Sequence, residues 1–253
     1  MKIKLEAHRG VSNEYPENTL SAFRAAKQLG YSMIELDTKF TADHVCVALH
    51  DNSLGRTGRN QNGTKPENDP KISTLTLDEA RKFDVGLFMG ESFRGERIPT
   101  LDEIIDFAKD AKIPLKFDNV LWTHEKVDRE KMFAALKESE IDFGITCTKL
   151  NEVEEVRKAL PTADIHFDGV VAEETLKALS ELVPYEKLWI WMRFDNPITS
   201  WNKTPPVDEG YAEMVKKYGK LAVWLLTTTE EATRAEALGA VIAETDGRLR
   251  PER

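Results

Sequence analysis

The sequence predicts a (β/α)₈ barrel, on the basis of its length, the alternation of its local patterns and the positions of its polar residues. The chain has 253 residues, of which 41% are hydrophobic, and about 250 residues is the usual size of this fold. Short strand-like runs alternate with amphipathic helical patterns, which is typical of βαβ units around a parallel sheet. Polar residues suited to catalysis follow several of these runs, at the strand ends where barrel active sites lie.

The strand-like runs carry apolar, β-branched and aromatic residues over lengths typical of strands. They are Ile3–His8, Met33–Phe40, Val45–His50, Ile113–Asp118, Phe143–Cys147, Ala163–Phe167, Leu188–Arg193, Leu221–Leu226 and Ala240–Thr245. The third run closely follows the turn-like Ala42-Asp43-His44 and is interpreted as a hairpin continuation of the second. Eight units then remain to close the barrel.

Helices are predicted between these strands. The first, from about Asn18 to Leu29, carries apolar residues on one face and ends at Gly30, and Asn18 is interpreted as its cap. Three later segments resemble capping boxes, in which a side chain at the cap is paired with an acidic residue three positions on. They are Thr76–Glu79, Thr100–Glu103 and Asn151–Glu154.

The stretch from about 51 to 99 does not follow the alternation. It is rich in Gly, Asn and Arg and carries one short helical pattern near Leu77–Phe83. Loops longer than about 15 residues usually carry function or a small subdomain, so this stretch is interpreted as an insertion after the second strand. Nothing marks a second domain, and residues 1–253 are expected to form one.

Composition excludes several classes of protein. The net charge of −9 argues against nucleic acid or an anionic membrane surface as the main partner. No apolar run approaches the roughly 18 residues of a spanning helix, so no integral membrane association is expected. Two cysteines cannot build a disulfide scaffold. Met1 leads directly into a strand-like run with no room for a signal peptide, and a cytoplasmic location is expected.

Glu35 and Asp37 are the strongest candidates for a metal site. They lie two residues apart on a strand, so both carboxylates point to one face while their apolar neighbours point to the other. Converging like charges repel each other, and a hard divalent cation with oxygen ligands removes that conflict. Asp118, at the end of another strand, is a candidate third ligand. The alternative is a solvated strand end or an ion pair with Arg9.

His8 and His50 are the candidates for general acid and base, since each closes a strand-like run and imidazole titrates near neutral pH. Arg9 presents a planar fork that matches phosphate, although an ion pair between loops is its alternative role. Gly10 allows a tight backbone turn. The remaining histidines, His44, His124 and His166, are expected to make structural hydrogen bonds.

Together these residues resemble the glycerophosphodiester phosphodiesterase family. Order and spacing agree over residues 8–57, and the matching segments are His8-Arg9-Gly10, Pro16-Glu17-Asn18-Thr19, Ala22-Phe23, Glu35-Leu36-Asp37, Thr41-Ala42-Asp43, His50-Asp51 and Arg56-Thr57. The stretch 95–101 resembles the end of that family's insertion. Residues 239–246 and Trp224 resemble its closing strands more weakly.

The resemblance implies a (β/α)₈ barrel that hydrolyses glycerophosphodiesters to glycerol 3-phosphate and an alcohol. It implies that Glu35, Asp37 and the third carboxylate bind Mg²⁺ or Ca²⁺, that His8 and His50 act as acid and base, and that Arg9 contacts the phosphate. The small-molecule diester is then the expected partner. The pattern fixes neither the alcohol nor the oligomeric state.

One strand departs from that family's pattern, which usually reads apolar-Glu-apolar-Lys. Here Asp118 stands in place of the Glu and Val120 in place of the Lys. Lys116 lies on the same strand face as Asp118, two residues deeper, and could reach upward. The departure leaves open two alternatives: a phosphodiesterase for a lysophospholipid or sugar phosphodiester, or a catalytically weak barrel that binds phosphorylated ligands. Trp224, near the top of its strand, is a candidate pocket wall.

Overall fold

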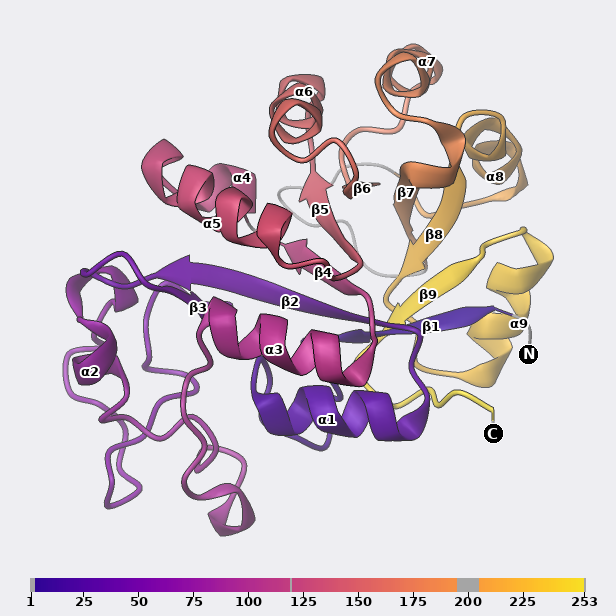
Figure 1. Ribbon diagram of the computed structural model, residues 1–253. Helices are drawn as coiled ribbons and strands as arrows, with labels where there is room; N and C mark the ends of the chain where they lie inside the picture. Colours follow the sequence, from indigo (N-terminus) through magenta and orange to yellow (C-terminus); the bar gives the residue numbers. More distant parts are fainter. Residues whose placement is uncertain (1–2, 119, 195–204, 253) are drawn as a thin grey trace.

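The computed structural model confirms the barrel and describes residues 3–118, 120–194 and 205–252. Eight parallel strands form it: β1 (Lys4–His8), β2 (Met33–Phe40), β4 (Leu115–Asp118), β5 (Phe143–Cys147), β6 (Asp164–Phe167), β7 (Leu188–Arg193), β8 (Lys220–Trp224) and β9 (Ile242–Thr245). Each pairs with the next around the ring, and the pairing of β1 with both β2 and β9 closes it (Figure 1). All eight predicted barrel strands are therefore present.

The ninth strand, β3 (Cys46–Ala48), runs antiparallel to the end of β2. Thr38 pairs with Ala48 and Phe40 with Cys46 in this hairpin, which confirms its interpretation as a continuation of the second strand. The hairpin extends β2 beyond the barrel wall and carries the chain to His50. It thus places His50 at the same end of the barrel as the residues that close β2.

Helices surround the barrel and bury their apolar faces against the strands (Figure 1). They are α1 (Leu20–Leu29), α3 (Leu101–Ala111), α4 (Val120–Thr123), α5 (Lys126–Glu138), α6 (Leu150–Ala159), α7 (Glu173–Leu182), α8 (Glu209–Lys216) and α9 (Thr229–Ala237), with a short 3₁₀ turn, η3 (Tyr185–Lys187), before β7. The capping boxes at Thr76 and Thr100 are confirmed, since each threonine accepts from the N3 amide and each glutamate accepts from the cap amide.

Two predicted helix caps were wrong. The cap of α1 is Thr19, whose hydroxyl accepts from the backbone N–H of Ala22 at 3.3 Å, while Asn18 makes tertiary hydrogen bonds instead. Helix α6 begins at Leu150, so Asn151 lies inside it, and the Glu152 carboxylate accepts from the backbone amides of residues 148 and 149. A capping residue is selected by where the backbone enters the helix, and two adjacent polar residues can satisfy the same sequence pattern.

The segment between β3 and α3 lies to one side of the barrel, at the lower left of Figure 1. It contains η1 (Ile72–Thr74), α2 (Leu77–Ala80) and η2 (Glu91–Phe93). Its buried apolar residues pack with Val47 of β3 in a cluster separate from the main core: Leu49, Leu54, Ile72, Ala80, Val85 and Ile98. The predicted insertion after the second strand is therefore a packed layer with a small core of its own.

Aromatic rings stack on one another in the interior of the barrel. The imidazole of His166 stacks between two indoles, with centroid distances of 5.6 Å to Trp189 and 5.8 Å to Trp191. Lys220 places its ammonium 3.5 Å from the centroid of the first indole, and Lys116 lies 3.8 Å from that of the second. The Trp191 indole N–H donates to His166 Nδ1 at 2.8 Å, so this histidine has the structural hydrogen bond expected of it.

Within the described ranges, no helix is long and apolar enough to cross a membrane. The cytoplasmic location stays a prediction.

Candidate active site at the C-terminal end of the barrel

Three carboxylates meet where β2 and β4 end. Glu35 and Asp37 lie on one face of β2, and Asp37 is the register neighbour of Asp118 across the parallel pair. One oxygen of each lies within 4.8 Å of those of the other two, and both β2 carboxylates are buried. The two-residue period of the strand and the parallel register therefore bring together the three residues predicted as metal ligands.

The Glu35 carboxylate has the features of a group that lacks its counter-ion. Its Oε2 accepts the backbone N–H of Arg9 at 2.8 Å, but its buried Oε1 has no hydrogen-bond partner. Burial, and then the nearby carboxylates of Asp37 and Glu244, raise the pKa of Glu35 well above its usual value. An all-oxygen donor set with an orphaned, desolvated carboxylate oxygen fits a hard divalent cation.

Asp37 is stabilised as an anion by two neighbours. Burial alone would favour the neutral acid, but Arg9, whose Nε lies 3.2 Å from Asp37 Oδ2, and the Asn18 amide lower its pKa. The Asn18 amide nitrogen donates to Oδ2 at 3.0 Å, and the Asp37 backbone N–H donates to Asn18 Oδ1 at 3.1 Å. The two β2 carboxylates therefore have different environments: Asp37 is held by Arg9 and Asn18, whereas Glu35 keeps one buried oxygen without a hydrogen-bond partner.

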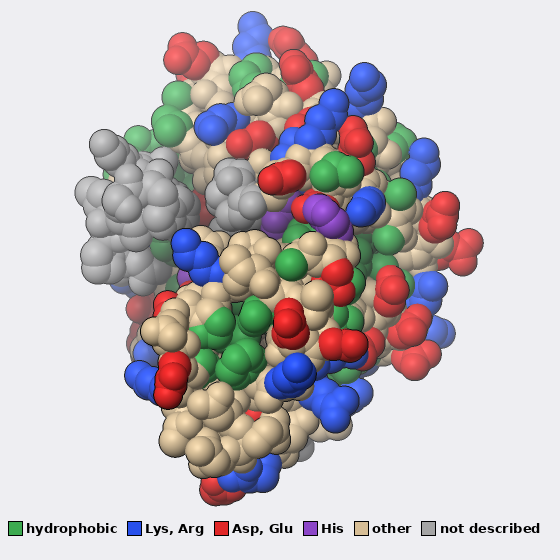
Figure 2. All heavy atoms as spheres, turned by 90° about the vertical axis from the view of Figure 1, so that its left-hand side faces the viewer, with side chains coloured by type: hydrophobic (Ala, Val, Ile, Leu, Met, Phe, Trp, Pro, Cys, Tyr) green, Lys and Arg blue, Asp and Glu red, His purple; other side chains and the backbone are tan. Residues whose placement is uncertain are grey.

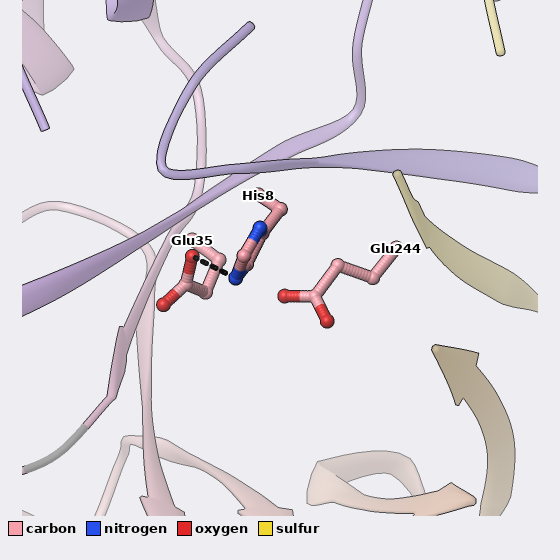
Figure 3. Close-up of side chains that lie close together, drawn as sticks. All are labelled: His8, Glu35 and Glu244. Carbon is pink, nitrogen blue, oxygen red and sulfur yellow. Dashed lines mark ion pairs between the residues drawn. The ribbon is translucent and has the colours of Figure 1, made fainter. Parts of the chain in front are cut away.

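His8, the last residue of β1, lies beside Glu35 in register. Its Nε2 is 4.0 Å from Glu35 Oε2, and Figure 3 shows the imidazole between the carboxylates of Glu35 and Glu244. Ligating atoms of these three side chains also lie within 4.8 Å of one another. Burial lowers the pKa of His8, with Arg9 adding to the effect and Glu244 opposing it, so burial favours the neutral imidazole.

His50 is held by a chain of charged groups at the rim. Its Nδ1 lies 2.6 Å from Asp51 Oδ1, Arg56 contacts the same carboxylate at 2.7 Å, and Arg56 also pairs with Glu17. Despite partial burial, the hydrogen bonds from Arg56 and His50 lower the pKa of Asp51 to about 2. Asp51 thus remains an anion at neutral pH. Its contact with Nδ1 orients the His50 imidazole, and Nε2 takes no part in that contact.

Arg9 occupies the tight turn that follows β1. Its backbone has φ 56° and that of Gly10 has φ 79°, and a Cβ on Gly10 would lie 2.7 Å from the Cβ of Ala22. The guanidinium pairs with Glu17 at 3.0 Å as well as with Asp37. The ion pair weighed as an alternative for Arg9 is therefore present, and contact with a phosphate stays a proposal.

A buried charged cluster lies beneath these residues and was not predicted. Lys116 does not reach the rim: its ammonium donates to Glu6 at 2.8 Å and to Glu244 at 3.3 Å inside the barrel. Burial and the Glu244 charge raise the pKa of Glu6 to about 8, against the opposing effect of Lys116. One signal was available in the sequence, because Glu6 is two residues before His8 and so shares its strand face.

Residue 120 does not lie on the strand that carries Asp118. Strand β4 ends at Asp118, and Val120 begins α4 and is fully buried in the main hydrophobic core. The position where the resemblance implied a lysine is therefore occupied by a core residue. Lys39, the next residue after Asp37 on the same face of β2, is a cation at this rim that the sequence reasoning passed over.

The indole N–H of Trp224, at the end of β8, donates to Asp168 at 3.3 Å. Burial raises the pKa of Asp168 well above its usual value, and Asp118 contributes to the same shift. Trp224 packs against the interior cluster that contains Trp191 and is partly exposed. Its role as a pocket wall stays a prediction.

Figure 2 looks onto the end of the molecule toward which β2 points. Histidine side chains reach the surface there among both acidic and basic groups, and the apolar side chains gather lower on the same face. Histidine and charged side chains of both signs are therefore open to solvent on this face.

Comparison with known families agrees with this arrangement. The model of the glycerophosphoryl diester phosphodiesterase family matches residues 8–246. The chain belongs to this family. The match begins at His8, the last residue of β1, and ends after β9, so it includes the seven other barrel strands and the residues from His8 onward that form the site.

Curated relatives are about one third identical to this chain over the aligned part of the sequence. A glycerophosphodiester phosphodiesterase of Caldanaerobacter subterraneus is 34% identical over 165 residues, which are 64% of this chain and 64% of the relative. Human glycerophosphodiester phosphodiesterase 1 is 32% identical over 160 residues, 60% of this chain and 44% of the relative. The chain thus spans less than two thirds of the length of these relatives.

Solved structures share the fold at lower identity. An Oleispira antarctica phosphodiesterase, in complex with the product sn-glycerol-3-phosphate, superposes with a TM-score of 0.76 at 20% identity and covers 97% of this chain and 93% of that one. A glycerophosphodiester phosphodiesterase from Agrobacterium tumefaciens gives 0.69 at 19% identity, with 96% of each chain covered. These likenesses support the barrel over nearly its whole length.

Proposed function

We propose that this protein hydrolyses glycerophosphodiesters to glycerol 3-phosphate and an alcohol, acting as a single domain over residues 1–253. The observation that carries the proposal is that His8 and His50, at the ends of β1 and of the β3 hairpin, lie at the same end of the barrel as the cluster of three carboxylates. The names of the curated relatives and the product held by the Oleispira phosphodiesterase support the same substrate class.

Glu35, Asp37 and Asp118 are the residues that would hold a divalent cation, Mg²⁺ or Ca²⁺. Such an ion, when bound, supplies Lewis acidity to the phosphoryl oxygens. The orphaned Glu35 Oε1 supports this assignment, because a buried carboxylate oxygen without a donor is costly unless a cation satisfies it.

The two histidines divide the proton transfers. Burial favours a neutral His8, so its imidazole can accept a proton from the attacking water or hydroxyl. The Asp51 carboxylate, 2.6 Å from His50 Nδ1, orients the second imidazole, which delivers the proton to the departing alkoxide. Arg9 orients the phosphate through its guanidinium, and Trp224 forms a wall for the substrate.

The test is a turnover assay with purified protein over a panel of glycerophosphodiesters, with added Mg²⁺ or Ca²⁺ and with excess chelator. We expect release of glycerol 3-phosphate that chelator abolishes and a divalent ion restores. Lysophospholipids and sugar phosphodiesters belong in the panel, because preference for one of them would replace the proposed substrate. Full activity in excess chelator would exclude the metal, and binding without turnover of any substrate would indicate a phosphate-binding barrel.

A further inference from the structure

The basic side chains near Glu35, Asp37 and Asp118 differ in whether they form ion pairs with acidic side chains. Arg9 pairs with Glu17 and Asp37, and Arg56 pairs with Glu17 and Asp51. Lys39 is different: its ammonium donates to the backbone carbonyl of Thr38 at 3.1 Å. Within the described parts of the chain, no carboxylate oxygen lies within 4.0 Å of it. A carbonyl group carries no net charge, so the charge of Lys39 remains without a direct counter-ion.

The location of Lys39 connects this charge to the site. On β2 the residues Glu35, Asp37 and Lys39 follow one another at intervals of two, so all three belong to the face that turns toward the barrel interior. Lys39 is the last of the three in the chain direction and is only 5% exposed. Burial lowers the pKa of Lys39, and the charges of Asp37, Asp118 and Asp51 oppose that shift.

A desolvated ammonium without an anionic partner is costly, and a bound anion would offset that cost. Lys39 lies nearer the C-terminal end of β2 than Glu35 and Asp37 do. A phosphodiester that enters from that end of the barrel would therefore approach Lys39 before it reaches the two carboxylates. The equivalent cation is absent from β4, because residue 120 is the buried Val120. Lys39 can thus supply from β2 the positive charge that the resemblance placed after Asp118 on β4.

We propose that Lys39 is a phosphate-binding residue of this site, with its ammonium donating to a non-bridging oxygen of the substrate phosphate. The inference rests on the proposed function, since it names the group that recognises the phosphate of that substrate. The bond is a charge-assisted hydrogen bond, and such bonds are roughly twice as strong as neutral ones.

The experiment compares Lys39→Met with wild type by calorimetric titration of sn-glycerol 3-phosphate in saturating Mg²⁺, together with kcat and KM. We expect phosphate binding to weaken about 10- to 100-fold, the range expected for a lost hydrogen bond to a charged group. Mg²⁺ affinity should be unchanged or higher, because a positive charge near Asp37 and Asp118 is removed. Lys39→Arg should retain most of the binding.

Lys220→Met is the matched control. Its ammonium also donates to a backbone carbonyl, that of Glu186 at 2.6 Å, but it lies at the start of β8, at the opposite end of the barrel. That variant should bind sn-glycerol 3-phosphate as wild type does. Melting curves of all variants show which are folded, and Lys39→Gln replaces Lys39→Met if the latter unfolds.

The results separate the two proposals. Wild-type affinity for sn-glycerol 3-phosphate in a folded Lys39→Met protein would overturn the inference while leaving the activity intact. Absence of turnover by wild type, combined with binding that depends on Lys39, would overturn the proposed function and support the inference. Absence of any sn-glycerol 3-phosphate binding by wild type would overturn both.

Discussion

Asn18 and Asp37 form a reciprocal pair of hydrogen bonds between the loop before α1 and strand β2. The Asn18 side chain donates to Asp37 Oδ2 and accepts from the Asp37 backbone N–H, at 3.0 and 3.1 Å. Asn18 adopts φ 56°, a backbone region that asparagine tolerates better than most residues. The pair fixes the direction of one of the three carboxylates before any cation arrives.

We therefore expect Asn18→Ala to weaken Mg²⁺ binding by roughly 10- to 100-fold, the usual effect of removing a group that orients a metal ligand. Thr19→Ala is the matched control: it removes the α1 cap and should cost about 1 kcal/mol of stability while Mg²⁺ affinity is retained. Calorimetric titration and chemical denaturation of both variants measure the two effects. Equal Mg²⁺ affinity in Asn18→Ala and wild type would show that Asp37 needs no such support.

Asp118 is expected to control the choice of ion. Mg²⁺ requires near-octahedral oxygens at about 2.0–2.1 Å, whereas Ca²⁺ accepts less regular bonds at roughly 2.3–2.6 Å. Asp118→Asn removes a charge at nearly constant shape and should weaken the binding of both ions. Asp118→Glu, one methylene longer, should preserve binding and shift the preference toward Mg²⁺. Titration of each variant with each ion tests this, and wild-type affinity in Asp118→Asn would remove Asp118 from the ligand set.

Loss of either histidine proposed as acid or base should reduce turnover without unfolding the protein. We expect His8→Ala and His50→Ala each to lower kcat by roughly 10²-fold or more, the contribution of acid–base catalysis. His44→Asn is the control, because His44 is half-exposed and its partner is Asp128, at 2.9 Å, which is not one of the three candidate metal ligands. It should retain full activity. A fully active His8 or His50 variant would show that the histidine in question is structural.

Metal affinity should rise with pH. The pKa of Glu35 lies well above its usual value because of burial and the carboxylates of Asp37 and Glu244, so in the metal-free protein this group still holds a proton where free glutamate has lost it. A cation binds the carboxylate form and must displace that proton, so affinity increases up to the pKa and is constant above it. Calorimetry in buffers of different ionisation enthalpy counts the protons released. An affinity that stays constant between about pH 5 and 8 would contradict the expectation.

The sequence predicts the fold well because each barrel unit repeats the same two signals. Strands of four to eight residues recur eight times with helices between them, so an error at one boundary does not alter the count. The positions of Glu35 and Asp37 follow from the two-residue period of a strand. The nearness of Asp118 follows from the parallel register that places it beside Asp37.

What the sequence did not predict depends on contacts between distant segments. Asn18 satisfies a local rule for helix caps, but its partner is 19 residues away on β2. Lys116 finds its two glutamates 110 and 128 residues away, across the barrel interior. The position of Lys39 could have been predicted, since it follows Asp37 by two residues and so shares the strand face of Glu35 and Asp37. Its lack of a carboxylate partner could be established only from the folded arrangement.

The ring stack of Trp189, His166 and Trp191 has a consequence for the passage of ligands. These rings belong to the interior of the barrel, and the interior of such a barrel is a packed core and not a pore, so we expect no ligand to pass from one end through to the other. Substrate and product of the proposed reaction therefore use one entrance. Glycerol phosphate that accumulates outside would occupy that entrance in competition with fresh diester. The steady rate would then be set partly by how quickly some other reaction consumes the product.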